Sequence, residues 1–272
     1  MDYLLVIFAG ALQGVTEFLP ISSSAHLVLF HDIFNFNLPD NLAFDAVLHL
    51  GTFFSLLIFF GREIWQLIKG FFSSLTNWNL QHDFNQRLAW LIIIGSLPAL
   101  IVGFAFDDLI DKYFHEGRLV IAIIAFMLAA GAVLFWLAEK YAKQVKELNN
   151  LTWRQSLVCG LAQAVALVPG VSRSGVVIIA GMTQKMKRAD AAKFSFLLSL
   201  PVVLGAGASS LFRVNLGAEI DLLSLSLGFV TAAFFGYLAV KYFLRFVAAH
   251  SLSVFAWYRA IVAAVLTLWL LL

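Results

Sequence analysis

Apolar residues run through long stretches of this chain, and short polar segments separate these stretches. A helix needs about 20 predominantly apolar residues to span the hydrocarbon core of a bilayer. Six stretches reach that length, near residues 42–61, 88–106, 118–138, 190–212, 222–246 and 252–271. The pattern therefore predicts an all-α integral membrane protein with six transmembrane helices.

Two further apolar stretches are interrupted by a proline and a group of serines. The first covers 3–19, ends at Pro20 and resumes near 24–34, and the second covers 153–168 and resumes near 175–182. Non-helical backbone at membrane depth is tolerated only where protein buries it or where it lines a water-filled cavity. We therefore expect both stretches to be re-entrant helical hairpins whose tips meet inside the protein.

An internal repeat supports this arrangement. A shift of 150 residues superposes polar as well as apolar positions, placing Gly10, Gln13, Val15, Ser22 and Ser24 on Gly160, Gln163, Val165, Ser172 and Ser174. We predict a single membrane domain, 1–272, built from repeat halves 1–140 and 150–272. Each half holds one hairpin and three spans, so the odd number of spans inverts the second half. Repeats of inverted topology place a binding site near the bilayer midplane.

Small residues four positions apart occur in the first arm of each predicted hairpin. Gly10 and Gly14 form one such pair, and Gly160 and Ala164 form the other. Pairs with this spacing allow helix backbones to approach closely inside a membrane. We therefore assign these four residues to helix packing.

Composition agrees with a lipid environment. Of the 272 residues, 61% are apolar and 12% are charged, and the mean hydropathy is +0.90. A formal charge of +2 gives no basic excess that would indicate a nucleic-acid partner. The single cysteine, Cys159, excludes an intramolecular disulfide. No basic residue precedes Arg62, so the apolar N-terminus lacks the positive region of a signal peptide and is expected to remain in the mature protein.

The basic residues predict an orientation. In the predicted topology, one side keeps only Lys112, Arg118 and Arg213, while the opposite side holds most of the lysines and arginines. Cytoplasmic loops of membrane proteins carry an excess of Lys and Arg. The basic side is therefore predicted to be cytoplasmic, with both chain termini outside.

Several ionisable residues fall inside the apolar segments: Glu17, His26, Asp45, His49, Arg173 and Arg259. Such groups cost about 2.5–3.5 kcal/mol on insertion scales, so they indicate function. Gln13 and Glu17 lie four residues apart on one helix face. Their oxygens suit a hard divalent cation. The alternative is a structural ion pair between Glu17 and Arg173 that braces the hairpin tips.

The two interrupted segments resemble anion sites. Ser22, Ser23 and Ser24 precede a short helix that contains His26, and the second interruption reads Pro169-Gly-Val-Ser-Arg-Ser-Gly175. Backbone N–H groups at a helix N-terminus bind anions, although serines there are more often helix caps. Two such tips facing each other favour phosphate binding, with a guanidinium fork from Arg173.

His26 is the candidate nucleophile or proton donor at the tips. The alternative is a packing role, which is common for a lone histidine in an apolar context. Asp45 and His49 share a helix face. They are candidates to orient each other or His26.

These motifs resemble those of the undecaprenyl-diphosphate phosphatase (bacitracin-resistance) family. The likeness rests on Gln13-Gly-Val-Thr-Glu17, on Phe18-Leu-Pro-Ile-Ser-Ser-Ser-Ala-His26 and on Pro169-Gly-Val-Ser-Arg-Ser-Gly175, and it extends over essentially the whole chain. The chain departs from the family pattern Pro-Gly-x-Ser-Arg-Ser-x-x-Thr at its last position, where Val177 replaces threonine. One hydrogen bond to the substrate or to its surroundings is therefore in doubt.

The resemblance implies hydrolysis of undecaprenyl diphosphate to undecaprenyl phosphate and phosphate. That reaction recycles the lipid carrier of cell-wall precursors in the bacterial cytoplasmic membrane and requires a divalent metal, which we expect to be Mg²⁺, with Ca²⁺ as the alternative. The resemblance assigns Gln13 and Glu17 to the metal or to water. It assigns Ser23 and His26 to the reaction centre, leaving open which of them attacks phosphorus. It assigns the diphosphate to Ser172, Arg173 and Ser174, and we expect Ser22 and Ser24 of the first tip to join them in substrate binding. Glu17 and Arg173 are expected to take part in catalysis as well.

Two other functions are compatible with parts of the pattern. Broken helices in inverted repeats are typical of secondary transporters, so a lipid flippase or carrier with a midplane phosphate site is the main alternative. The serine and histidine cluster opposite an arginine favours chemistry over transport. A second type of membrane phosphatase, with a Ser-Arg-x5-His signature, is excluded because Ile179 stands at the histidine position.

Overall fold

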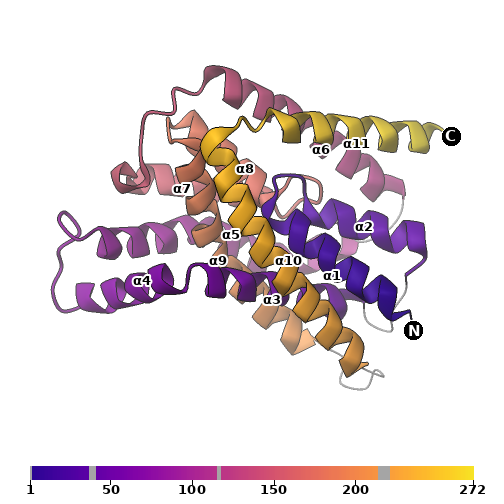
Figure 1. Cartoon of the computed structure of the whole chain (residues 1–272), viewed down its shortest axis with the longest axis horizontal. Helices are drawn as coiled ribbons and strands as arrows, with labels where there is room; N and C mark the ends of the chain where they lie inside the picture. The colour runs from indigo at the N-terminus through magenta and orange to yellow at the C-terminus, as the bar shows by residue number, and fades with distance from the viewer. Residues whose placement is uncertain (1, 37–40, 115–117, 214–220) are drawn as a thin grey trace.

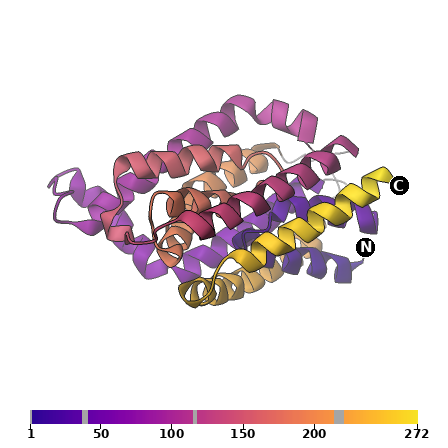
Figure 2. The same ribbon diagram turned by 90° about the horizontal axis from the view of Figure 1, so that it is seen from above.

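The structure is a computed structural model that describes residues 2–36, 41–114, 118–213 and 221–272, and it is helical throughout apart from turns and loops (Figure 1). Its helices are α1 (Tyr3–Phe18), α2 (Ser23–Phe34), α3 (Asn41–Phe59), α4 (Gly61–Ser74), α5 (Phe84–Phe114), α6 (Arg118–Tyr141), α7 (Trp153–Val165), α8 (Arg173–Thr183), α9 (Arg188–Arg213), α10 (Leu222–Ala249) and α11 (Ser253–Leu271). A short 3₁₀ helix, η1 (Leu148–Asn150), precedes α7. Figure 2 shows the same helices running side by side as one elongated bundle.

Within the described residues, five helices are long and apolar enough to cross a membrane: Phe84–Phe106 of α5, α6, Arg188–Gly207 of α9, α10 and α11. The sixth predicted span, near 42–61, corresponds to α3 and continues after a bend of 83° into α4. The chain is therefore a multi-pass membrane protein, with five spans or with six if the bent pair counts as one. The sequence did not predict α4 because Arg62, Glu63 and Lys69 interrupt its apolar positions.

The two predicted hairpins are present. The first consists of α1 and α2, which are separated by residues 19–22, and the second consists of α7 and α8, which are separated by residues 166–172. Each pair packs side by side. Both first arms end well short of the length needed to cross a bilayer, because a helix rises only 1.5 Å per residue.

The first helix of each half packs against a helix of the other half. Helix α1 packs mainly on α10, and its repeat equivalent α7 packs on α5. Glycines make these contacts close: a Cβ added at Gly10 would lie 2.8 Å from the carbonyl oxygen of Gly228, and one at Gly160 would lie 2.0 Å from that of Gly95. The packing role assigned to both glycines is confirmed. The exchange supports the inverted repeat, whose exact topology and half boundaries stay predictions.

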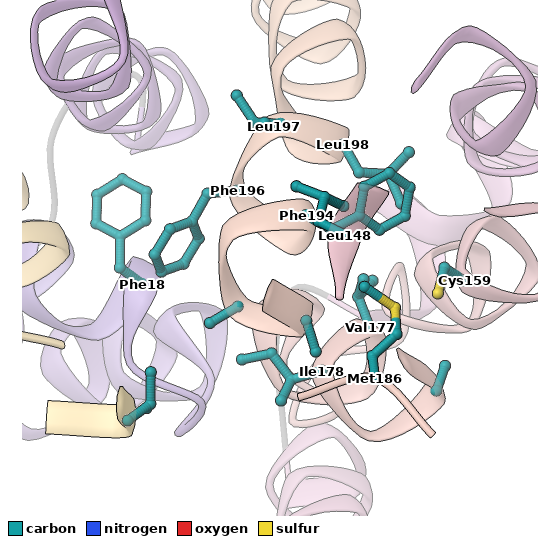
Figure 3. Close-up of a cluster of buried hydrophobic side chains, with 14 of the residues drawn as sticks. Phe18, Leu148, Cys159, Val177, Ile178, Met186, Phe194, Phe196, Leu197 and Leu198 are labelled. Carbon is teal, nitrogen blue, oxygen red and sulfur yellow. The ribbon is translucent and has the colours of Figure 1, made fainter. Parts of the chain in front are cut away.

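The main apolar core fixes the second hairpin against α9. Figure 3 shows Val177 and Ile178 of α8 facing the cluster that Phe194 and Phe196 of α9 belong to. Phe18, the last residue of α1, meets Phe196 edge to face with ring centroids 5.3 Å apart. Helix α9 therefore contacts both hairpins through a single run of aromatic residues.

Ion pairs connect the segments at the end of the bundle that the sequence assigned to the basic side. Arg188 forms a bidentate pair with Glu139, and Lys187 lies 2.5 Å from Glu147. The hydrogen bond from Lys187 lowers the pKa of Glu147 below its ordinary value. Both chain termini lie together at the other end of the bundle (Figure 1). This separation agrees with the predicted charge asymmetry.

Substitution of Gly160 by alanine tests the contact between α5 and α7. The added methyl group would meet the Gly95 backbone, which cannot move aside, and overpacking of this kind costs about 1–3 kcal/mol. We expect a lower midpoint of thermal unfolding in detergent, measured by circular dichroism. Gly103→Ala is the matched control, because nothing lies within 4 Å of its added methyl. Equal midpoints for the two variants would contradict the close contact.

Candidate active site

The two hairpin tips have the same local geometry. Ser22 caps α2 and accepts a hydrogen bond from the Ala25 N–H, and Ser172 caps α8 and accepts one from the Gly175 N–H. Both serines have positive φ angles, 75° and 71°. Strained backbone of this kind costs about 1–3 kcal/mol per residue and concentrates at functional sites. The equivalence extends the repeat from sequence to backbone conformation.

The tips meet, as the sequence predicted. The Ser174 hydroxyl donates to the carbonyl oxygen of Leu19 in the opposite tip at 3.3 Å. Within each tip the serines are neighbours: the Oγ atoms of Ser22 and Ser24 are 3.2 Å apart, and those of Ser172 and Ser174 are 3.4 Å apart. Hydroxyls from both hairpins and the N-termini of α2 and α8 therefore gather in one region.

Glu17 is the centre of this region. Its carboxylate, 7% exposed, accepts hydrogen bonds from Ser23 Oγ at 2.6 Å and from Gln13 Nε2 at 2.9 Å. Its second oxygen, Oε1, forms an ion pair with Arg173 from the opposite tip. The predicted Glu17–Arg173 pair is thus present. A buried carboxylate requires such a partner because an isolated charge in an apolar medium is costly.

Gln13 links Glu17 to a third helix. Its amide nitrogen also lies 2.9 Å from His49 Nδ1, and because an amide N–H only donates, that ring nitrogen accepts the bond. Gln13 Oε1 is buried and has no hydrogen-bond partner among the described residues. An unpartnered buried oxygen beside a carboxylate fits a hard divalent cation. The described residues contain no group of three or more His, Cys, Asp or Glu side chains arranged to hold a metal.

His26 is held on both sides of its ring. Nδ1 lies 2.7 Å from the carbonyl oxygen of Ser22, which only accepts, so Nδ1 carries the proton. Nε2 lies 2.6 Å from the Tyr258 hydroxyl of α11, and the two rings stack at an interplanar angle of 12°. In the neutral imidazole Nε2 therefore accepts from Tyr258. Both nitrogens are engaged, whereas the Ser23 hydroxyl points at Glu17.

The expected roles of Asp45 and His49 are partly wrong. Neither orients His26: Asp45 accepts from His31 Nε2 at 3.1 Å, and His49 contacts Gln13 and Glu17. His31 Nδ1 also faces the carbonyl oxygen of Phe36 at 2.9 Å. The periodicity placed Asp45 and His49 on one helix face, but it gave no information on which neighbouring helix each would meet.

Comparison with known proteins places this arrangement in a family. The family described as "Bacitracin resistance protein BacA" matches residues 6–265. The chain belongs to this family. The match includes every residue of the site described above, from Gln13 to Tyr258.

Curated relatives carry one name. The chain is similar to undecaprenyl-diphosphatases from Thermomicrobium roseum, at 42% identity over 95% of both chains, and Rubrobacter xylanophilus, at 38% identity over the full length of both. A third, from Corynebacterium glutamicum, is 41% identical over 93% of this chain and 85% of the relative. The resemblance read from the motifs is confirmed by these relatives.

Val177, the departure from the family motif, is a core residue. It is 1% exposed and packs in the main apolar cluster beside Met186 (Figure 3). Valine presents no polar group to this cluster, so here the position contributes packing.

Sequence reasoning did not assign a role to Tyr258 or Arg259. Tyr258 contacts His26, and the Arg259 guanidinium contacts backbone at both tips. A signal existed, because an arginine within an apolar span indicates function. The sequence alone did not show that α11 lies beside the hairpins.

Substitution of Tyr258 by phenylalanine tests the state of His26. Nitrogen NMR of histidine-labelled protein should show a neutral Nδ1–H ring, and Tyr258→Phe should shift the Nε2 resonance because its hydrogen-bond donor is lost. The His26 signal is assigned by its absence in His26→Gln. Tyr242→Phe, on the exposed face of α10, should leave the spectrum unchanged. An unaltered Nε2 signal in Tyr258→Phe would contradict the contact.

Proposed function

We propose that this protein hydrolyses undecaprenyl diphosphate to undecaprenyl phosphate and inorganic phosphate. The relatives named above are called undecaprenyl-diphosphatases. One observation in this chain carries the proposal: a serine hydroxyl, Ser23, donates to a buried carboxylate, Glu17, whose other oxygen pairs with Arg173 of the opposite tip. Phosphoryl transfer needs a nucleophile, a base that accepts its proton and a cation that stabilises the phosphoryl charge, and this site contains all three.

The surroundings suit a diphosphate on a lipid. The N-termini of α2 and α8 supply backbone N–H groups that favour phosphate oxygens. Ser22, Ser24, Ser172 and Ser174 supply hydroxyls, and Arg173 supplies a planar fork for two oxygens. Because the lipid-facing surfaces of the bundle are apolar, the isoprenoid tail can remain in the membrane beside the site.

Ser23 is the nucleophile in our proposal, because both ring nitrogens of His26 are already engaged. Its Oγ attacks the terminal phosphorus while its proton passes to Glu17. The bond from that phosphorus to the bridging oxygen breaks, and undecaprenyl phosphate leaves with the electron pair. One water molecule then attacks the phosphoserine, Glu17 returns its proton to the Ser23 oxygen as the phosphorus–oxygen bond breaks, and phosphate leaves with both protons of the water. Arg173 moves from Glu17 to the transferring phosphoryl group, where it stabilises negative charge.

We propose a divalent cation, Mg²⁺ or Ca²⁺, as cofactor. Gln13 Oε1 and a Glu17 oxygen would hold it, since the first is buried without a partner and the second is anionic. Mg²⁺ is commonly bound through one or two protein oxygens together with substrate phosphates. When bound, the cation would neutralise part of the diphosphate charge.

We place the protein in the bacterial cytoplasmic membrane with the site open to the outer face. The ion-paired segments that contain Lys187 and Arg188 support a cytoplasmic location for that end, because cytoplasmic loops carry an excess of Lys and Arg. The hairpin α1–α2 starts at the opposite end, beside both termini (Figure 1). Ser23 and Glu17 belong to that hairpin, which favours entry from outside.

Phosphate release from a short prenyl diphosphate by detergent-purified protein tests the function. We expect turnover with Mg²⁺ and loss of turnover with a chelator. Glu17→Ala and Arg173→Ala should each lower kcat/KM by at least about a hundredfold, the cost of removing one transition-state stabilising group. Ile261→Ala, on the lipid-facing side of α11, serves as control. Lipid transport into vesicles without phosphate release would replace the phosphatase by a flippase.

Ser23→Ala and His26→Ala distinguish the nucleophile. Ser23→Ala should abolish turnover, whereas His26→Ala should retain a measurable rate because it removes a neighbour and not the attacking atom. Acid quenching with a substrate labelled in its terminal phosphate should trap the label on Ser23. The reverse order of the two variants, or a trapped phosphohistidine, would transfer the role to His26.

Thiol labelling tests the access. Ser24→Cys in a Cys159→Ser background should react in intact cells with a membrane-impermeant reagent, because the Ser24 side chain is partly exposed. Lys143→Cys, in the basic loop after α6, should react only in inverted vesicles. If Ser24→Cys instead follows the Lys143→Cys pattern, the site opens to the cytoplasm.

A further inference from the structure

Arg259 lies at the junction of both hairpins and makes an unusual set of contacts. Its side chain, 0% exposed, donates to five backbone carbonyl oxygens, at 3.0–3.4 Å, those of Pro20, Met127, Leu128, Gly170 and Val171. Among the described residues no carboxylate lies within ion-pair distance of its guanidinium. Among these residues its positive charge is therefore balanced mainly by peptide dipoles.

Two of these carbonyls occupy matching places in the two interruptions, and a third is adjacent to one of them. Pro20 lies two residues before Ser22, and Gly170 and Val171 lie directly before Ser172. The repeat shift of 150 superposes Pro20 on Gly170. Arg259 therefore bonds to the segment that enters the strained serine in each tip. One side chain joins both breaks at equivalent points.

The polarity of a broken helix explains why this matters for an anion. The carbonyl groups of the interruptions, those of Pro20, Gly170 and Val171 among them, carry partial negative charge, whereas the second arm of each hairpin begins with N–H groups of partial positive charge. A diphosphate is attracted to the second set and repelled by the first. A cation bonded to the carbonyls of both breaks removes that repulsion and leaves the N–H groups for the ligand.

The protein is shaped to hold this guanidinium. A Cβ added at Gly131 of α6 would lie 2.0 Å from Arg259 Nη2, so a glycine is needed beside it. The ring of Phe135, one turn further along α6, lies 6.0 Å from Arg259 Cζ. The preceding residue, Tyr258, bonds to His26. Two adjacent residues of α11 thus contact the tips and the candidate histidine.

We propose that Arg259 is a positioning residue for the diphosphate. It holds the carbonyl groups of Pro20, Gly170 and Val171 away from the ligand, and its unpaired charge favours binding of the anion. This inference rests on the proposed function, because the anion is taken to be the substrate diphosphate. It assigns to α11 a part in substrate recognition.

Two substitutions separate the geometric part from the electrostatic part. Arg259→Lys keeps the charge but has one nitrogen, which cannot reach five carbonyls. We expect kcat for a short prenyl diphosphate to fall about tenfold, with KM within about threefold of wild type. Arg259→Gln also removes the charge, so KM should rise about tenfold or more. The inhibition constant of inorganic phosphate should rise with it.

Gly131→Ala displaces the guanidinium without altering any charged residue. It should lower kcat and leave KM nearly unchanged, like Arg259→Lys, and Ile261→Ala on the exposed face of α11 should behave as wild type. Circular dichroism in detergent checks folding. If Arg259→Gln fails to fold, Arg259→Lys and Gly131→Ala decide the matter.

Two results would overturn the inference. Wild-type kcat and KM in both Arg259→Lys and Gly131→Ala would eliminate the geometric role. A KM in folded Arg259→Gln equal to that in Arg259→Lys would eliminate the electrostatic one. Absence of phosphate release from the wild-type protein would instead refute the proposed function, so the two failures are distinguishable.

Discussion

A helix that breaks inside a membrane leaves peptide groups without partners, and lipid cannot supply them. Both hairpins of this chain contain such a break, between α1 and α2 and between α7 and α8. Each stray group costs free energy comparable to a lost hydrogen bond. In this structure the two breaks supply partners to each other, because the Ser174 hydroxyl of one tip donates to the Leu19 carbonyl of the other. The Arg259 guanidinium also donates to carbonyl groups of both breaks. The rest of the bundle is arranged to make this junction stable.

The junction explains why so much charge is tolerated at this depth. Glu17 and Arg173 come from opposite tips, so their ion pair forms only when the hairpins have met. Gln13, Ser23 and His49 surround the carboxylate with polar partners. A buried pair of this kind contributes little net stability. In the proposed function, the same groups serve the transferring phosphoryl group when the substrate enters.

Much of this arrangement follows from the sequence. Hydropathy located the spans and both hairpins within a few residues, because apolar length and helix breakers act locally. The repeat predicted that the tips meet, and the expected Glu17–Arg173 contact is present. The contacts of Tyr258 and Arg259 were not predictable, because they depend on where α11 docks. The bend into α4 was also not predicted, because the charged residues of this amphipathic helix interrupt its apolar positions.

The exchange of partners between the halves constrains how the protein is made. Helix α1 emerges from the ribosome long before its main partner, α10, is synthesised. Before α10 is synthesised, Gly10 lacks its packing contact with Gly228. Glu17 likewise lacks its ion-pair partner until Arg173, more than 150 residues downstream, is synthesised. Contacts between such distant segments form slowly. The first hairpin must therefore remain in the membrane without these contacts, and the site assembles only after α10 and the second hairpin have been inserted.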